Sequence, residues 1–285
     1  MLHDGTTNIL GIDFEEWFHP QIVQKYLGSK KRDLSVVNGL DKILDLLRSY
    51  ETTATFFVVG ELLECRPEIL DKIISNGHEI GFHTMHHTRL DDPGFEESFA
   101  KELTDFAELT SNHSRGFRAP TFSLNQKSSW AIDVLSEHQY LYDSSVMPVK
   151  TSMYGISGAE TRPYRISSSS LGKNDPSGKI LEFPLLTTRI FGRQIPAAGG
   201  FYLRTLPMGI ITNAIKNYQR AGIPATFYIH SWELTPELMP KIPMSFKDSF
   251  ITFHNIGKAF SNMEKLLQNF TFTSFDRYIR KAGLV

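Results

Sequence analysis

The stretch GHEIGFHTMHH, residues 77–87, joins a short apolar strand to a cluster of histidines. His83 and His87 are four residues apart, so on a helical turn they would share one face and could direct ring nitrogens at one ion. His86 would point elsewhere, and His78 is expected to be a structural residue on the strand. A chain with ten histidines contains about 0.35 such pairs by chance, so the spacing predicts a metal site only together with further ligands.

Segments typical of strands and helices alternate on both sides of this stretch. Apolar or β-branched runs predict further strands at 8–12, 53–60, 116–120, 140–143, 179–183 and 225–230. Helical periodicity and start or stop residues predict helices at 36–47, 67–77, 92–106, 128–135, 207–221, 262–268 and 274–281. Ser35 is a candidate N-cap. About seven alternations without a phosphate-binding glycine loop favour a distorted, closed or partly closed parallel β/α barrel over a dinucleotide-binding sheet.

Polar residues with catalytic potential fall at the carboxyl ends of the predicted strands, where barrel active sites are built. They are Asp13, Glu15, His83, Arg118, Asp143 and His230. In an extended segment Asp13 and Glu15 project to one side, so Glu15 is favoured over Glu16 as a metal ligand beside His83 and His87. Two imidazoles and one carboxylate leave a position open for water or substrate, as a metal-dependent hydrolase requires.

Composition and charge narrow the classes of partner. The 30 basic and 31 acidic residues give a net charge of -1, which favours a neutral molecule or glycan over nucleic acid or an anionic membrane surface. No shift in composition marks a linker, so we expect one catalytic domain over residues 1–285, with 238–285 as a C-terminal extension packed on the barrel. The polar segment 161–178 is a surface excursion that could shape the substrate groove, as could 238–253.

Cellular location is predicted from cysteine usage and from the absence of export or anchoring signals. The single cysteine, Cys65, fits a reducing compartment and is expected to be buried. The first residues show no signal-peptide pattern, and no window is apolar enough to span a bilayer. We therefore expect a cytoplasmic protein that meets the inner face of the membrane only through its substrate.

Several ordered motifs resemble the polysaccharide deacetylase family, the metal-dependent N-deacetylases of carbohydrate esterase family 4. HTMHH at 83–87 is similar to the His-[Ser/Thr]-x-x-His motif, RAP at 118–120 to Arg-x-Pro, and FYIH at 227–230 to the final histidine motif. The segments DFEEWFH at 13–19, GGFY at 199–202 with Arg204, and IHSWE at 229–233 look more like a branch found with bacterial exopolysaccharide and cell-surface glycan synthesis.

This resemblance implies a role for each matching residue. Asp13 would be the base that activates water, Arg118 would hold it ionised, and His230 would protonate the departing amine. The backbone N–H of Thr121 would help to bind the oxyanion, and Asp143 would orient His230. One divalent transition metal, with zinc as the first choice, would be held by His83, His87 and a carboxylate.

The chain departs from the family pattern at two places. The common first motif is two adjacent aspartates followed by glycine, whereas the acids here are Asp13, Glu15 and Glu16, so the carboxylate ligand could be either glutamate. Thr121 stands where many members have an aromatic residue. The residues expected to contact the sugar are Trp17, Phe122, Tyr202, Arg204 and Trp232.

The expected function is removal of an N-acetyl group from an amino sugar in a glycan or a lipid-linked glycan precursor. One alternative keeps the chemistry and changes the substrate to an N-formyl sugar or a cyclic imide. Another is a catalytically silent glycan-binding barrel, in which the altered first motif no longer binds metal. The presence of Asp13, Arg118 and His230 argues against the silent barrel, because a binding module needs no base and acid.

Overall fold

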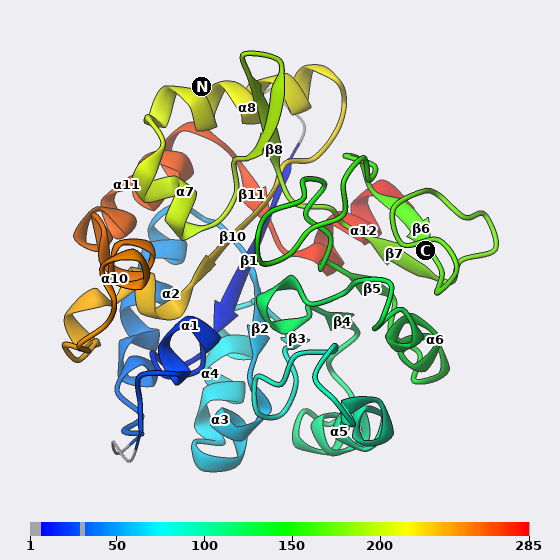
Figure 1. Ribbon diagram of the computed structural model, residues 1–285, viewed down its shortest axis with the longest axis horizontal. Coiled ribbons are helices and arrows are strands. Elements are labelled where there is room, and N and C mark those ends of the chain that lie inside the picture. Colours follow the sequence, from blue (N-terminus) through cyan, green and yellow to red (C-terminus); the bar gives the residue numbers. More distant parts are fainter. Residues whose placement is uncertain (1–6, 29–31, 285) are drawn as a thin grey trace.

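A curled sheet of mostly parallel strands forms the centre of the computed structural model, which describes residues 7–28 and 32–284 (Figure 1). Its strand order is β10-β1-β2-β3-β4-β5-β7-β6, and every neighbouring pair is parallel except β6 with β7. The bounds are β1 Asn8–Phe14, β2 Thr55–Val58, β3 Glu79–Phe82, β4 Gly116–Phe117, β5 Tyr142–Asp143, β6 Tyr164–Ile166, β7 Ile180–Glu182, β10 Thr226–His230 and β11 Phe272–Thr273, which pairs with the start of β1.

The sheet curls back on itself between the chain after β7 and the start of β10. A single parallel bridge joins Leu185 to Thr226, and the Leu186 N–H donates to the Thr226 carbonyl at 3.0 Å. β1, β2, β3, β4, β5, β7 and β10 thus form a ring that is closed weakly at one seam. The prediction of a distorted parallel barrel of about seven strands is confirmed.

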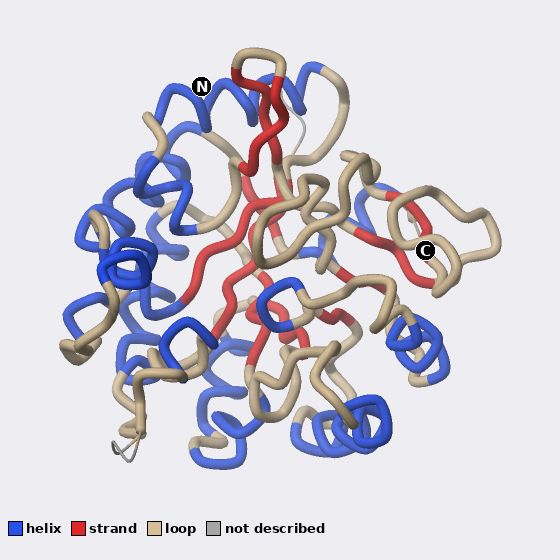
Figure 2. The backbone as a smooth tube through the Cα atoms, in the orientation of Figure 1, coloured by secondary structure: helices blue, strands red, loops and turns tan. Residues whose placement is uncertain are grey.

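Helices cover the outside of the ring, as Figure 2 shows. Their bounds are α1 Gln21–Gln24, α2 Leu40–Ser49, α3 Gly60–Cys65, α4 Glu68–Ser75, α5 Phe95–Leu109, α6 Trp130–Glu137, α7 Gly200–Thr205, α8 Met208–Arg220, α9 Ser231–Leu234, α10 Phe246–Phe253, α11 Ala259–Asn269 and α12 Phe275–Ala282. Four 3₁₀ turns cover Val36–Gly39, Pro120–Phe122, Pro236–Leu238 and Ile256–Lys258. α1, α3, α7, α9, α10 and a hairpin of β8, Thr187–Ile190, and β9, Arg193–Pro196, were not predicted from the sequence.

Two local predictions are wrong. Ser35 precedes the first 3₁₀ turn without capping it, because its hydroxyl donates instead to the carbonyl of Leu238 at 2.9 Å. Cys65 is exposed rather than buried, because it is the last residue of the short helix α3. The stretch from which no signal peptide was predicted is Met1–Thr7, and its residues 1–6 lie outside the described part of the chain.

Side-chain alternation divides the strands into an outward face and an inward face. Leu10, Ile12 and Phe14 belong to the large outer core beneath the helices. The inner face carries a second, smaller cluster that fills the floor of the ring. Its members are Ile9, Phe57, Tyr142, Leu181, Phe183, Phe275 and Ile279. Asp13, Arg118 and His230 belong to the same inner face, above this floor.

Segments from both halves of the chain meet in this one sheet, because β10 lies beside β1 and β7 beside β5. The polar segment 161–178 includes β6, the last strand on the open edge of the sheet. In the described part of the chain, no helix has the length and apolar character needed to cross a bilayer.

Candidate active site

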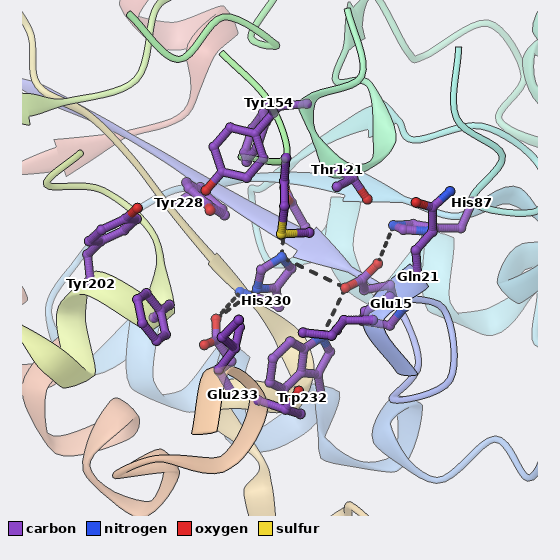
Figure 3. A pocket seen from close by; sticks show the side chains of 18 of the residues that line it. Glu15, Gln21, His87, Thr121, Tyr154, Tyr202, Tyr228, His230, Trp232 and Glu233 are labelled. Carbon is purple, nitrogen blue, oxygen red and sulfur yellow. Dashed lines mark hydrogen bonds and ion pairs between the residues drawn. The ribbon is translucent and has the colours of Figure 1, made fainter. Parts of the chain in front are cut away.

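A pocket opens at the carboxyl ends of the strands, and side chains from distant parts of the chain line it (Figure 3). Its polar members include Asp13, Glu15, His83, His87, Thr121, Arg204, His230 and Glu233. Segment 151–154 and the C-terminal residues Ile251 and Thr252 form part of the wall. The 238–253 segment therefore contributes to the pocket as predicted, through Ile251 and Thr252. No residue of the 161–178 segment lines the pocket.

Glu15, His83 and His87 form a compact, fully buried cluster. Their potential ligand atoms all lie within 4.8 Å of one another, and Glu15 Oε2 is 2.7 Å from His87 Nε2. Trp232 Nε1 donates to the other oxygen, Glu15 Oε1, at 2.9 Å. Apart from this contact with His87, Glu15 Oε2 has no hydrogen-bond partner among the described residues. A buried set of two nitrogens and one oxygen with an unsatisfied carboxylate oxygen fits a divalent transition metal.

The two histidines converge for a reason that differs from the predicted one. The residues after β3 form a loop rather than a helical turn, and Thr84 and His87 adopt left-handed φ values of 58° and 56°. His83 Nδ1 lies 2.7 Å from the Arg118 carbonyl, to which it can donate, so that Nε2 is left for the cluster. The predicted helical turn is therefore wrong, although His83 and His87 do meet in one cluster.

Strand geometry distinguishes the two candidate glutamates. Glu16 points away from the cluster and accepts a hydrogen bond from the Val37 N–H at 2.8 Å. Burial raises the pKa of Glu16. Burial also opposes ionisation of Glu15, but His87, together with His230 and His83, outweighs it and lowers the pKa of Glu15. Burial lowers the pKa of His83 to about 4, which keeps its ring neutral and able to bind a metal.

Asp13 is held by a buried arginine, Arg118, that directly follows β4. Arg118 Nη1 donates to Asp13 Oδ1 at 2.6 Å, while Nε and Nη2 donate to the carbonyl and hydroxyl of Ser144. The guanidinium is completely buried and lies 4.1 Å from the centre of the Phe57 ring. These contacts fix one carboxylate oxygen and leave Asp13 Oδ2 facing His230 Nε2 at 3.9 Å.

His230 is oriented by Glu233 and not by Asp143 as predicted. Its Nδ1 is 2.8 Å from Glu233 Oε2, and Arg204 Nε and Nη2 donate to Glu233 Oε1 at 3.1 and 2.9 Å. Burial disfavours the imidazolium, but the hydrogen bond and charge of Glu233 outweigh it and raise the pKa of His230 to about 9. His230 is therefore a protonated donor at neutral pH.

Strand register explains the error over Asp143. In a parallel sheet, residues paired across strands share a face, and Asp143 is paired with Phe117 and Glu182 on the outer face. Its Oδ1 accepts from Ser145 Oγ at 2.5 Å. Burial raises the pKa values of Asp143 and Glu182, as expected for two neighbouring buried carboxyl groups.

Aromatic side chains form much of the pocket wall. Phe122 contacts Tyr154 and Tyr228 edge to face, and Trp232 stacks on His230. Tyr202 also lines the pocket, as does Thr121, which has a left-handed φ of 53°.

Two residues predicted to contact the sugar have their polar groups bound within the chain. Trp17 is buried outside the pocket, with its Nε1 donating to the Asp33 carbonyl at 3.1 Å. Arg204 is buried at the pocket wall and is engaged by Glu233 and by the carbonyls of Ile251 and His254. Both side chains have their polar groups committed to partners within the chain.

Sequence reasoning missed Glu233, Tyr154, Tyr228 and the pair His19 and Glu61. Glu233 stands three residues after His230, and this spacing forms a capping box at α9, which is a signal that could have revealed it. The His19 ring stacks on His87, and its Nε2 is 2.6 Å from Glu61 Oε1.

His78 and His86, the remaining histidines of the 77–87 stretch, lie as predicted. His86 is exposed beside Glu61, with its Nδ1 3.1 Å from Glu61 Oε2. His78 accepts a hydrogen bond from the Ala54 N–H and is structural.

Comparisons with known families divide the chain in two. Residues 33–142 match the polysaccharide deacetylase family, and residues 144–280 match a domain of unknown function, DUF3473. The chain is 27% identical over 224 residues to the peptidoglycan deacetylase of Helicobacter pylori, covering 77% of this chain and 62% of that protein. It is 28% identical over 141 residues to a peptidoglycan-N-acetylglucosamine deacetylase of Bacillus cereus, covering 50% and 49%. The chain thus spans less than two thirds of the length of these relatives.

Solved structures agree with the fold alone. A Mycobacterium smegmatis protein assigned as a polysaccharide deacetylase superimposes with a TM-score of 0.58 at 17% identity, covering 100% of this chain and 93% of that one. The 4-alpha-glucanotransferase of Thermococcus litoralis gives 0.55 at 15% identity, covering 96% and 40%. The second match shows that the barrel alone does not select the chemistry. Together with the buried Glu15, His83 and His87 cluster, the comparisons show that residues 33–142 are similar to the polysaccharide deacetylase family and that residues 144–280, which follow them, match DUF3473.

Proposed function

We propose that this protein is a metal-dependent hydrolase that removes the N-acetyl group from an amino sugar in a glycan or a lipid-linked glycan precursor. One observation carries the proposal. The Glu15, His83 and His87 cluster lies beside both a candidate base and a candidate acid, because His230 Nε2 is 3.9 Å from Asp13 Oδ2 and 3.9 Å from Glu15 Oε1. A pure binding module has no need for this combination.

The reaction adds water across an amide bond. A divalent transition metal held by Glu15, His83 and His87, with zinc as our first choice, would polarise the amide carbonyl and acidify water. Asp13, fixed by Arg118, accepts a proton from the water as its oxygen attacks the carbonyl carbon. His230 Nε2 gives its proton to the nitrogen as the C–N bond breaks, so that acetate and a free amino sugar leave. The backbone N–H of Thr121 would donate to the developing oxyanion.

The pocket wall is suited to hold a sugar ring. Phe122, Tyr202 and Trp232 present aromatic surface around the acid, and such faces pack on the apolar side of a pyranose. The peptidoglycan deacetylases among the relatives support an amino-sugar substrate for this chain.

Metal content and acetate release test the proposal together. We expect about one transition-metal ion per chain, and loss of both metal and turnover in His87→Ala and Glu15→Ala. Glu16→Gln is the matched control and should keep its metal, because its side chain faces Val37. Asp13→Asn should keep the metal and lose about 10²-fold to 10⁴-fold in turnover.

A substrate panel separates the nearest alternatives. N-acetyl, N-formyl and cyclic amide substrates should be offered to the metal-loaded protein, and only N-acetyl sugars should be turned over. Protein with one ion bound and no acetate release from any N-acetylhexosamine conjugate would contradict the proposed substrate. Failure to bind any metal, even after incubation with zinc, would support a silent glycan-binding barrel instead.

A further inference from the structure

The hairpin of β8 and β9 ends in a two-residue turn with an unusual first residue. Ile190 pairs with Arg193, so the turn consists of Phe191 and Gly192, with φ values of 48° and 76°. Two consecutive left-handed residues define a type I′ turn, whose first position strongly favours Asn, Asp or Gly. In Figure 1 the hairpin projects from the barrel beside α8.

Phe191 is unfavourable at this position in two independent ways. A phenylalanine in the left-handed region is strained relative to Asn or Gly. Its ring is also completely exposed, at 101% of the reference area, which makes it the most exposed large apolar residue described. Neither feature stabilises the isolated chain in water. A residue that is both strained and exposed in this way is expected where its side chain serves binding rather than folding.

The hairpin lies within a long segment that has no negative charge. Residues 183–232 contain no Asp or Glu, although the whole chain has 31 of them. Arg189 and Arg193 are exposed on either side of the turn. α8 packs against the hairpin, with Tyr218 Oη 3.1 Å from Thr187 Oγ1, and adds two exposed cations, Lys216 and Arg220. Arg189 and Arg193 therefore flank the exposed ring in sequence, and further cations lie on the helix that packs against the base of the hairpin.

We propose that this hairpin tip docks the protein on an anionic lipid bilayer, with Phe191 at the boundary between headgroups and acyl chains and Arg189 and Arg193 against the lipid phosphates. The apolar stem of arginine can lie along the boundary while its guanidinium contacts phosphate. A convex tip with one apical ring suits a bilayer better than a glycan, because ligand sites for small molecules and sugars are concave.

The nearly neutral net charge does not oppose this docking. Electrostatic attraction is screened over about 8 Å at physiological ionic strength, so a surface responds to its local charges rather than to the sum over the chain. The net charge of -1 is a sum over the whole chain and does not describe the local charge around this hairpin. The proposal is independent of the proposed deacetylase activity, because the hairpin contributes none of the residues that line the pocket.

Vesicle co-sedimentation of the full chain tests the docking. The wild-type protein should bind vesicles of phosphatidylglycerol and phosphatidylcholine, bind phosphatidylcholine alone much more weakly, and lose affinity at high salt. Arg189→Gln combined with Arg193→Gln should weaken binding about 25-fold, at about fivefold for each arginine. Phe246→Ser is a matched control, since Phe246 is also highly exposed, at 88%, but lies beside Asp248.

Phe191→Asn distinguishes binding from folding. It should weaken vesicle binding by about tenfold or more, and its Tm should be unchanged or raised by about 1–2 °C, because Asn-Gly favours the type I′ turn. The proposal is overturned if the wild type ignores anionic vesicles, if Phe191→Asn binds as well as the wild type, or if Phe246→Ser loses as much affinity. A clear fall in the Tm of Phe191→Asn, or binding to anionic polysaccharide only, would also overturn it.

Discussion

At the scale of single residues, His230, the proposed acid, depends on a pair of buried charges. Glu233 links the imidazole to Arg204, and Arg204 also binds the carbonyls of Ile251 and His254 in the C-terminal segment. Gly200 keeps this arrangement possible, because a Cβ there would lie 1.8 Å from Glu233 Oε2. The second half of the chain therefore supplies both the proposed acid, His230, and the groups that orient its ring.

Glu233→Gln should weaken the acid and shift its pH dependence. The folded protein holds the pKa of His230 near 9, above the ordinary 6.5, so the proton donor is present below about pH 9 and is lost as the pH rises through it. Without the negative charge the pKa falls, and the alkaline limb of the kcat profile should move to lower pH. We expect about a tenfold or larger fall in kcat at pH 8.

The matched control for that change is Glu237→Gln, which removes a surface carboxylate paired with Lys42. Metal content should be unchanged in both variants, because neither residue belongs to the Glu15, His83 and His87 cluster. An alkaline limb that stays in place in Glu233→Gln would show that Glu233 does not set the protonation of His230.

At the scale of elements, register decides which polar groups meet. Asp13 and His230 are direct partners across β1 and β10 and therefore share the inner face. Glu79, at the start of β3, belongs to the same face at its lower end and joins three elements. It accepts hydrogen bonds from the Asp276 N–H of α12 at 2.9 Å, the Tyr142 hydroxyl of β5 at 2.8 Å and the Thr55 hydroxyl of β2.

Glu79→Gln should flatten the pH dependence of folding stability. Burial raises the pKa of Glu79 to about 7 from 4.5, so between these values the folded state holds a proton that the unfolded state releases. The wild-type free energy of unfolding should therefore fall as the pH rises from about 4.5 to about 7 and then level off. Glutamine retains an acceptor oxygen and has no charge to bury.

Urea unfolding at pH 5 and pH 8 measures this effect. The loss of stability between the two values should be smaller in Glu79→Gln than in the wild type by about 1 kcal/mol or more. Glu97→Gln, on the exposed face of α5, is the control and should behave like the wild type. Equal pH dependence in Glu79→Gln and the wild type would show that Glu79 does not carry the effect.

At the scale of the whole molecule, the C-terminal segment completes the barrel interior. Phe275, the first residue of α12, is fully buried among rings from β2, β5 and the end of β7. Its ring stacks on Tyr142 at 4.9 Å and lies 5.5 Å from Phe57, which in turn supports Arg118. The floor under Arg118 therefore includes Phe275, a residue more than 100 positions further along the chain.

Phe275→Ala should destabilise the fold by about 3–5 kcal/mol, because it leaves a cavity that the stiff ring of strands cannot close. Activity at a temperature where the variant is folded should also fall, since Phe57 and Arg118 lose their support. Phe246→Ala, which truncates an exposed ring, should change the free energy of unfolding by less than about 0.5 kcal/mol. A loss below about 1 kcal/mol in Phe275→Ala would show that α12 does not fill the interior.

The sequence by itself determined the alternation of strands and helices and the gathering of Asp13, Glu15, His83, Arg118 and His230 at one end of the barrel. It could do so because a strand repeats every two residues and the carboxyl ends of parallel strands lie at one edge. These are local and topological regularities that a single chain displays directly.

Only the tertiary structure decided which of these groups act on one another. Asp143 stands at a strand end like the others, yet its register with Phe117 places it on the outer face, and Glu233 takes the predicted place beside His230. Trp17 is buried away from the pocket. His87 reaches Glu15 through left-handed loop residues rather than a helical turn. Register, burial and loop conformation depend on contacts between distant segments, and local propensity does not encode those contacts.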